Sequence, residues 1–380
     1  MSIETNIKLL NEDTEHLYRV QKIKFSSSKH ITTPTKTIPL DRLRLKDSLN
    51  TKSRQLNEIF KRFTSEKIKE ANEDNDKFTK IESEFNSNMN KVQENDSTFC
   101  FLDFAENIFP TSEEIEFMID IAYCNSDITT IPTISQIKIK EENFSDFLNY
   151  LNNAIETIEQ LNNKPIMGMI PSVAPKKVED LLNLYEEKGI NSFLLDLDGK
   201  NPITARMRIF RILKILNKKK LLDSSYIHGH NVGMRVAKIV DVIPAKDILG
   251  FGLGLNSLGE KRKIFHPNKA FLNYIKTNPE NKFRLFNKED YGYWKGLASK
   301  ELDKIWPEDS SFETISFKEA KTSGYLQKAF NVEQLALASH KLREIVNEEP
   351  NKTLDFIKNK KYVKKEDIKI IENVKKKIAK

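Results

Sequence analysis

The sequence predicts an α/β protein folded as a TIM-like (β/α)8 barrel, with a helical insertion after the first strand and a C-terminal helical extension. Two observations support this fold class. From residue 98 onward, short apolar runs alternate with amphipathic helical stretches at intervals of roughly thirty residues, which is typical of parallel βαβ units. Acidic, histidine and glycine residues follow these runs, where the carboxyl-end loops of a barrel gather its functional side chains.

Six strands can be assigned as short apolar runs of the kind found in strands buried on both faces, and an early strand near residues 35–40 makes seven. They span residues 35–40, 98–103, 127–131, 164–170, 192–196, 225–228 and 247–251. A closed barrel requires an eighth strand, and no further run of this kind can be recognised.

The helices between these strands have recognisable ends. Residues 111–114, Thr-Ser-Glu-Glu, follow Pro110 and predict a capping box. Pro175 stands where the first residue of a helix is expected, and Gly189 follows the last turn of the same helix.

Two regions interrupt the alternation. Residues 43–95 are polar and carry apolar residues at helical spacing, which predicts a helix or helical hairpin inserted between the first and second barrel strands. The barrel is then expected over 1–264, including that insertion. Residues 265–346 would form an appendage and a C-terminal helix packed on the barrel, and 347–380 a basic helical tail.

Charge and composition limit the function classes. Residues 351–380 hold eleven lysines and four acidic residues, a difference of +7 that equals the net charge of the whole chain. A basic tail on a neutral body favours a polyanion such as tRNA or DNA, although a solvated helix is the alternative. The sequence has no apolar run long enough to cross a membrane, no apolar segment typical of a signal peptide, and too few cysteines for a disulfide framework. We therefore expect a cytoplasmic protein without a membrane partner.

Three carboxylates at strand ends are candidate catalytic residues. Asp103 closes an apolar strand and could act as a general base or nucleophile, or as a helix cap or loop ion pair. Asp196 and Asp198 alternate along one strand, so they are expected on the same side. Paired carboxylates suit acid–base or glycosidic chemistry, but Asp198 followed by Gly199 is equally a turn signature.

His228, His230 and Asn231 follow another strand and are candidate substrate-binding residues. The two histidines have a spacing compatible with one metal ion if a third ligand such as Asp198 joins them. Hydrogen-bonded histidines at the barrel rim are the alternative, and we expect neither a metal nor a cofactor.

The glycine-rich run at residues 250–259 contains Gly252 and Gly254, where a bare backbone could approach a phosphate. This run is not a Walker sequence. Asp127 and Ser172 complete the expected substrate-binding set.

The order of several segments resembles the tRNA-guanine transglycosylase family, including its archaeal and DNA-modifying branches. The similar segments run from about residue 20 to residue 346 and agree in order and spacing more than in identity. They are Ile31–Pro39, Phe101–Asn107, Met167–Val173, Phe193–Gly199, Tyr226–His230, Lys246–Gly250 and Gln334–Ile345.

The resemblance implies exchange of guanine or a 7-deazaguanine base by an aspartate-dependent double displacement. It assigns Asp103 as the acid–base aspartate. At the position of the family's nucleophile, three residues after Asp247, this chain has Gly250. The family's base-reading glutamine falls near Pro171, and the three cysteines of its structural zinc site are missing.

Three hypotheses follow for the function. The chain is a base-exchange enzyme whose nucleophile is Asp196, Asp198 or Asp247. Alternatively, it is a non-catalytic subunit that binds nucleic acid or a catalytic partner, in a homodimer or in a heterodimer with a catalytic paralogue. A metal-dependent barrel hydrolase that uses His228, His230 and Asp198 is the third hypothesis.

Overall fold

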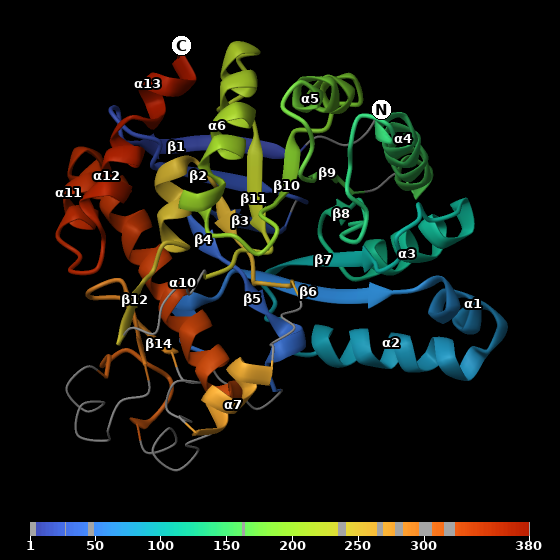
Figure 1. Ribbon diagram of the computed structural model, residues 1–380, viewed down its shortest axis with the longest axis horizontal. Helices are drawn as coiled ribbons and strands as arrows, with labels where there is room; N and C mark the ends of the chain where they lie inside the picture. The colour runs from blue at the N-terminus through green and yellow to red at the C-terminus, as the bar shows by residue number, and fades with distance from the viewer. Residues whose placement is uncertain are drawn as a thin grey trace.

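The structure is a computed structural model with a mixed α/β fold, in which parallel strands form two sheets (Figure 1). The residues that it describes are 5–26, 28–44, 49–161, 164–234, 241–263, 269–277, 284–295, 306–314 and 324–379. Among these residues, no helix combines the length and apolar character needed to span a bilayer.

The larger sheet has six parallel strands. In spatial order they are β4 (Thr35–Lys36), β13 (Ser257–Leu258), β11 (Tyr226–His230), β10 (Ser192–Asp196), β9 (Ile166–Ile170) and β8 (Thr129–Thr130). Most of the predicted strands are therefore confirmed. Their side chains are buried on both faces, because helices cover one side and the interior of the protein lies on the other.

The smaller parallel sheet comprises β5 (Ile38–Pro39), β6 (Leu56–Phe63) and β7 (Ser97–Phe104). Strands β6 and β7 pair over eight residues, which places Arg62 opposite Asp103. The two parallel sheets are connected at two places. Strands β4 and β5 are successive parts of one stretch of chain, and isolated parallel bridges join Phe99 to Ile128 and Asp103 to Thr133.

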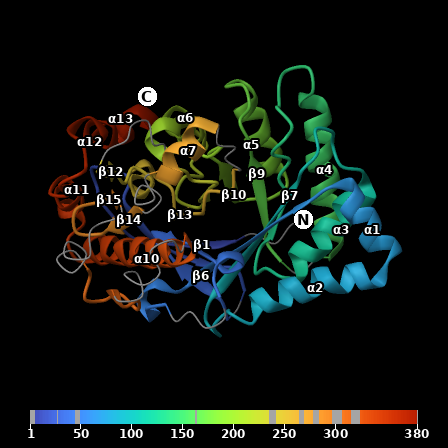
Figure 2. The same ribbon diagram turned by 60° about the horizontal axis from the view of Figure 1, so that its bottom comes forward.

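Helices follow the strands along the chain and pack outside them (Figure 2). They are α3 (Ser112–Cys124), α4 (Phe144–Leu161), α5 (Lys177–Glu187), α6 (Pro202–Lys218) and α10 (Gly324–Glu348). The capping box at Thr111 and Glu114 is confirmed. Helix α5 begins two residues after Pro175, and Gly189 follows its end with a positive φ of 69°.

The segment 43–95 differs from its prediction. It contains the short 3-10 helix η2 (Thr51–Ser53) and then strand β6, and only afterwards the hairpin α1 (Ser65–Glu73) and α2 (Asn75–Met89). The helical pair therefore connects the second and third parallel strands. The prediction of an insertion after the first strand was wrong because β6 buries Asn57 and Glu58, whose polarity conceals the strand pattern.

The predicted strand at 247–251 is also wrong. These residues overlap the 3-10 helix η3 (Ile248–Leu253), and the strand of this region is β13, six residues further on. Gly254 ends η3 with a φ of 91°, a conformation that glycine adopts without a steric penalty.

Two antiparallel sheets flank the parallel strands. At the N-terminus lie β1 (Asn6–Glu12), β2 (Arg19–Lys24) and β3 (His30–Thr32), and the 3-10 helix η1 (Leu40–Arg42) follows the first parallel strand. The second sheet combines β12 (Val242–Pro244), β15 (Gly292–Lys295) and β14 (Arg284–Asn287). The described part of the expected appendage thus includes β14, β15 and helix α7 (Lys269–Thr277), whereas β12 belongs to the range expected for the barrel.

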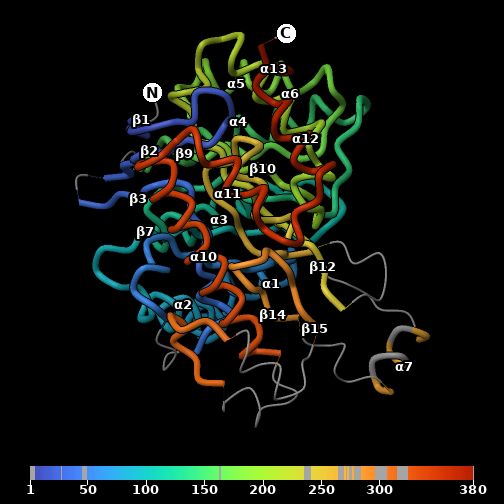
Figure 3. Tube along the Cα trace, turned by 90° about the vertical axis from the view of Figure 1, so that its left-hand side faces the viewer, coloured from blue at the N-terminus to red at the C-terminus, as the bar shows by residue number. Residues whose placement is uncertain are grey.

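The basic C-terminal segment is helical, as expected. It comprises η5 (Pro350–Lys352), α11 (Thr353–Lys358), α12 (Lys365–Glu372) and α13 (Val374–Ala379), which lie along the body (Figure 3). Ile357, Ile371 and Val374 are buried, and the Lys375 ammonium donates to the backbone carbonyls of Asp13 and Thr14. These helices therefore belong to the folded core rather than to a detached tail.

Candidate functional site

Charged side chains meet around His230, at the carboxyl end of β11. Its imidazole lies within electrostatic reach of Glu58, Asp196 and Asp103, and of the guanidinium of Arg262. The sequence predicted Asp103, Asp196 and His230 as site residues because each lies at the end of a strand. The structure brings them together with Glu58 and Arg262, which the sequence analysis missed.

Glu58 is a fully buried carboxylate whose two oxygens both accept hydrogen bonds. Arg262 Nε donates to Oε1 at 2.8 Å, while the Thr37 hydroxyl at 2.6 Å and the Glu260 backbone N–H at 3.2 Å donate to Oε2. Burial would raise the pKa of Glu58, but the charge of the Arg262 guanidinium outweighs it, so the pKa lies well below its ordinary value. Glu58 is therefore ionised and held in place.

Arg262 joins this carboxylate to a second one. Its two terminal nitrogens donate to the two oxygens of Asp41, at 2.6 and 2.9 Å. The guanidinium also lies over the ring of Phe60, 4.9 Å from the centroid. Such a forked donor between two carboxylates fixes both of them in orientation.

The two histidines are buried and uncharged. His228 Nδ1 bonds to the Ser257 hydroxyl at 2.7 Å, and Phe101 stacks on its ring at 5.0 Å. Burial lowers the pKa of His228 to about 3, although the charge of Glu58 opposes this shift, and burial also lowers the pKa of His230. Within the described residues, no group of three or more potential ligands is placed to hold a metal ion, so the third hypothesis gains no geometric support.

Two ring nitrogens in this cluster are buried and have no hydrogen-bond partner in the part of the chain that the structure describes. They are Nε2 of His228 and Nδ1 of His230. A Cβ on Gly259 would lie 2.8 Å from the former and 2.9 Å from Glu58 Oε2. Glycine at this position therefore avoids a clash with both groups, and the two buried nitrogens keep unused hydrogen-bonding capacity.

Asp103 is buried and saturated with hydrogen bonds. It accepts from Arg62 Nε at 2.9 Å, the Thr133 hydroxyl at 2.8 Å, and the backbone N–H and hydroxyl of Ser135 at 3.0 and 2.7 Å. A carboxylate has about four acceptor sites, so these four bonds leave little capacity for a substrate. Asp103 is placed to anchor the rim loops and to act on His230 through its charge.

Asp196 differs from the other carboxylates of the cluster. Its Oδ1 accepts from the Asp198 backbone N–H at 2.8 Å and from Asn231 Nδ2 at 3.1 Å. Its Oδ2 accepts no hydrogen bond from any residue that the structure describes, and the side chain is only partly buried. Asp196 is thus oriented through one oxygen while the other is open to a ligand.

Asn231 and Asp198 support this arrangement from the surrounding loops. Asn231 has a φ of 54°, and its Oδ1 accepts from the backbone N–H groups of Arg262 and Lys263 at 2.9 and 2.8 Å. Asp198 pairs with Lys263 at 2.7 Å and Lys200 at 3.4 Å. It does not share a strand face with Asp196, because β10 ends at Asp196 and Asp198 takes a left-handed turn conformation with a φ of 53°. The expectation of one shared face was therefore wrong.

The remaining predicted binding residues lie apart from the cluster. Asp127 is at the amino end of the strands, where it accepts from the Thr98 backbone N–H at 2.7 Å and from Lys29 at 3.3 Å. Ser172 is exposed after the end of β9. A Cβ at Gly252 would meet the side chains of Tyr18 and Ile371, and one at Gly254 those of Leu17 and Leu213, so the lack of a side chain serves close packing.

Acidification is expected to destabilise the protein through His228. Its pKa is about 3 in the folded state and about 6.5 when unfolded, so between these values the unfolded chain binds the extra proton. Stability is therefore complete above pH ~6.5 and falls as the pH decreases, by about 2 kcal/mol at pH ~5 from this residue alone. Urea unfolding of the wild type and of His228→Gln at both pH values measures this difference. An equal loss in the two proteins would contradict the assignment to His228.

Comparisons with known proteins give no family. No family model matches the chain, and neither does any curated protein. The carboxyl transferase domain of Rhizobium etli pyruvate carboxylase aligns with a TM-score of 0.39 and 8% identity, covering 80% of this chain and 48% of that one. The YdjI aldolase from Escherichia coli K12 aligns with a TM-score of 0.35 and 10% identity, covering 86% and 92%. The chain thus spans about half the length of the first of these structures.

Proposed function

We propose that this protein is an aspartate-dependent base-exchange enzyme acting on nucleic acid, with chemistry of the tRNA-guanine transglycosylase type and Asp196 as its nucleophile. One observation carries this assignment. The site around His230 contains four carboxylates, those of Asp41, Glu58, Asp103 and Asp196. Of these, only Asp196 has an oxygen that accepts no hydrogen bond from the described residues. A nucleophile needs such an accessible lone pair.

A closed eight-stranded barrel is the architecture that we propose for this enzyme. Residues 35–39 pair with β13 through β4 and with β6 through β5. The parallel bridge between Asp103 and Thr133 places β7 beside the stretch of chain that begins with β8. Counting 35–39 as one strand gives eight parallel strands in a ring, and Asp196, His230 and Asp103 then share its carboxyl-end rim.

The proposed exchange proceeds in two displacements at the anomeric carbon of a ribose. The free oxygen of Asp196 forms a bond to this carbon while the bond to the departing base breaks, and the base takes a proton from water. Uncharged His230 then accepts the proton of the incoming base, whose nitrogen attacks the same carbon and releases Asp196. The hydroxide from the first step takes the proton from His230, so both proton and charge balance.

Cationic side chains beside Asp196 support a polyanionic substrate. Lys200 and Lys263 are each about half exposed on the adjoining loops, and Arg208 lies close enough for its guanidinium to sense the charge of Asp196. Lysines in such positions bind phosphates and set the register of a nucleic acid without reading its sequence. tRNA and DNA are therefore the two substrates to test.

Incorporation of a labelled base distinguishes the proposal from its alternative. The protein is incubated with tRNA or with DNA and a labelled 7-deazaguanine base, and the label in the recovered nucleic acid is counted. We expect incorporation into one of the two nucleic acids. Salt-sensitive binding of both without incorporation would contradict the catalytic proposal and favour a binding subunit, which would require a catalytic partner.

A further inference from the structure

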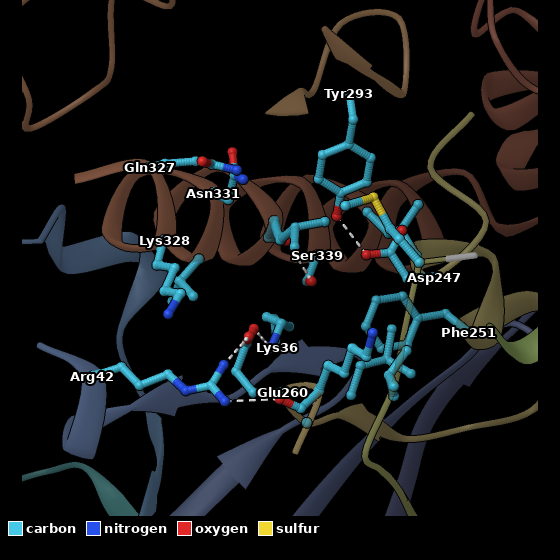
Figure 4. A pocket seen from close by; sticks show the side chains of 18 residues that line it. Lys36, Arg42, Asp247, Phe251, Glu260, Tyr293, Gln327, Lys328, Asn331 and Ser339 are labelled. Atoms are coloured by element: carbon cyan, nitrogen blue, oxygen red, sulfur yellow. Dashed lines mark hydrogen bonds and ion pairs between the residues drawn. The ribbon is translucent and has the colours of Figure 1, made fainter. Parts of the chain in front are cut away.

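A cavity of about 250 Å³ lies outside the parallel strands, between η3, the residues after β13, and helix α10 (Figure 4). The side chains of Lys36 and Thr37 show that this cavity is separate from the histidine cluster. Thr37 bonds to Glu58, whereas Lys36, the next residue along the same extended stretch, lines the cavity. Neighbouring residues of an extended chain point to opposite sides, so the cavity and the Glu58 cluster lie on opposite faces of this strand.

One end of the cavity presents an unsatisfied carboxyl group. The Tyr293 hydroxyl donates to Asp247 Oδ2, while Asp247 Oδ1 is buried and accepts no hydrogen bond from the residues that the structure describes. Burial also raises the pKa of Asp247 above its ordinary value. A buried oxygen without a partner in the wall of a cavity is a site for a donor group on a ligand.

The other end carries a surplus of positive charge. Glu260 pairs with Lys36 at 2.7 Å and with Arg42 at 3.4 Å, and Lys328 extends from α10 toward this group (Figure 4). Lys36, Arg42 and Lys328 thus gather around Glu260, and Asp41 and Arg262 also lie within electrostatic reach of Lys328. Partial burial and then the charge of Arg42 lower the pKa of Lys328, while Glu260 and Asp41 oppose this shift.

The wall between these ends is apolar. Ile248, Phe251 and Leu258 line it on one side and Val332 and Leu335 on the other. The volume of about 250 Å³ far exceeds the space that a single water molecule needs and is enough for one substituted ring. A ring against this wall would reach toward both polar ends.

We propose that this cavity is a second binding site, which takes a small aromatic anion bearing a hydroxyl or amino donor at the far side of its ring. The anionic group lies among Lys328, Arg42 and Lys36, and the donor bonds to Asp247 Oδ1. This site is independent of the base-exchange proposal, because none of its residues supplies the nucleophile or the histidines.

The test uses para-hydroxybenzoate as the probe, measured by isothermal titration or by ligand-observed NMR. We expect saturable binding with a Kd on the order of 1 mM. Lys328→Gln should weaken it about tenfold, because one charge-assisted contact is lost at an exposed position where folding is not at risk. Lys341→Gln, on the same helix but outside the cavity, is the matched control and should bind as the wild type does.

Two ligand comparisons test the ends of the site separately. Wild-type protein should bind para-hydroxybenzoate more tightly than benzoate, which lacks the donor, and more tightly than para-hydroxybenzyl alcohol, which lacks the charge. Asp247→Leu should abolish the first preference and keep the second. The absence of saturable binding, or equal binding by wild type and Lys328→Gln, would overturn the proposal. Asp196→Asn should leave this binding unchanged, so failure here and failure of the base-exchange proposal are distinguishable.

Discussion

Arg262→Met is expected to lower the free energy of unfolding by about 3–5 kcal/mol, the typical cost of removing one partner from a buried ion pair. The reason is the burial of Glu58, whose side chain has no exposed surface and whose Oε1 would lose its donor at 2.8 Å. Asp41 would lose both of its bonds to the same guanidinium. Urea denaturation followed by circular dichroism measures the change as a shift of the midpoint.

Two further variants separate the ion pair from general packing. Arg206→Met changes an arginine that donates to the backbone of its own helix, and it should alter stability by no more than about 0.5 kcal/mol. Glu58→Leu combined with Arg262→Met removes both buried charges and should recover part of the loss. A double variant less stable than Arg262→Met alone would contradict the view that an unpaired Glu58 causes the destabilisation.

Asp196→Asn is expected to reduce base exchange by at least about a thousandfold, since an amide oxygen cannot replace the attacking carboxylate. Its fold should be preserved, because Asn can still accept the bonds from the Asp198 backbone and Asn231 through its oxygen. Initial rates of label incorporation with saturating nucleic acid measure this effect on kcat.

Asp198→Asn is the matched control for this prediction. Its carboxylate pairs with Lys263 and Lys200 at a half-exposed position, so its loss should change the rate less than about tenfold. If Asp198→Asn were inactive and Asp196→Asn active, Asp198 would be the nucleophile. This result would contradict the proposal that the free oxygen of Asp196 attacks the ribose.

The fold could be predicted where strands are apolar throughout. The runs ending at Asp103 and Asp196 become β7 and β10 because both faces of each strand are buried. Strand β6 escaped prediction because Leu56, Ile59, Phe60 and Phe63 also fit the spacing of a helix. Only the long-range pairing with β7 decides between the two.

The candidate site was predictable in part for a related reason. Asp196, His230 and Asn231 follow strands, and parallel strands bring their carboxyl ends to one edge. The partnership of Glu58 with Arg262 spans 204 positions in the chain, and that of Asp41 with Arg262 spans 221. No local pattern encodes such contacts, and the buried charge of Glu58 is acceptable only because these distant partners meet it.

The central claim is that Asp196 attacks the ribose, and mapping a trapped covalent adduct tests it most directly. The protein is incubated with its nucleic acid in the presence of hydroxylamine as a competing nucleophile, quenched in acid, digested, and examined by peptide mass spectrometry. We predict a ribosyl or hydroxamate modification on the peptide that contains Asp196, and its absence from Asp196→Asn. A modification on any other carboxylate, or an adduct that persists in Asp196→Asn, would contradict the claim.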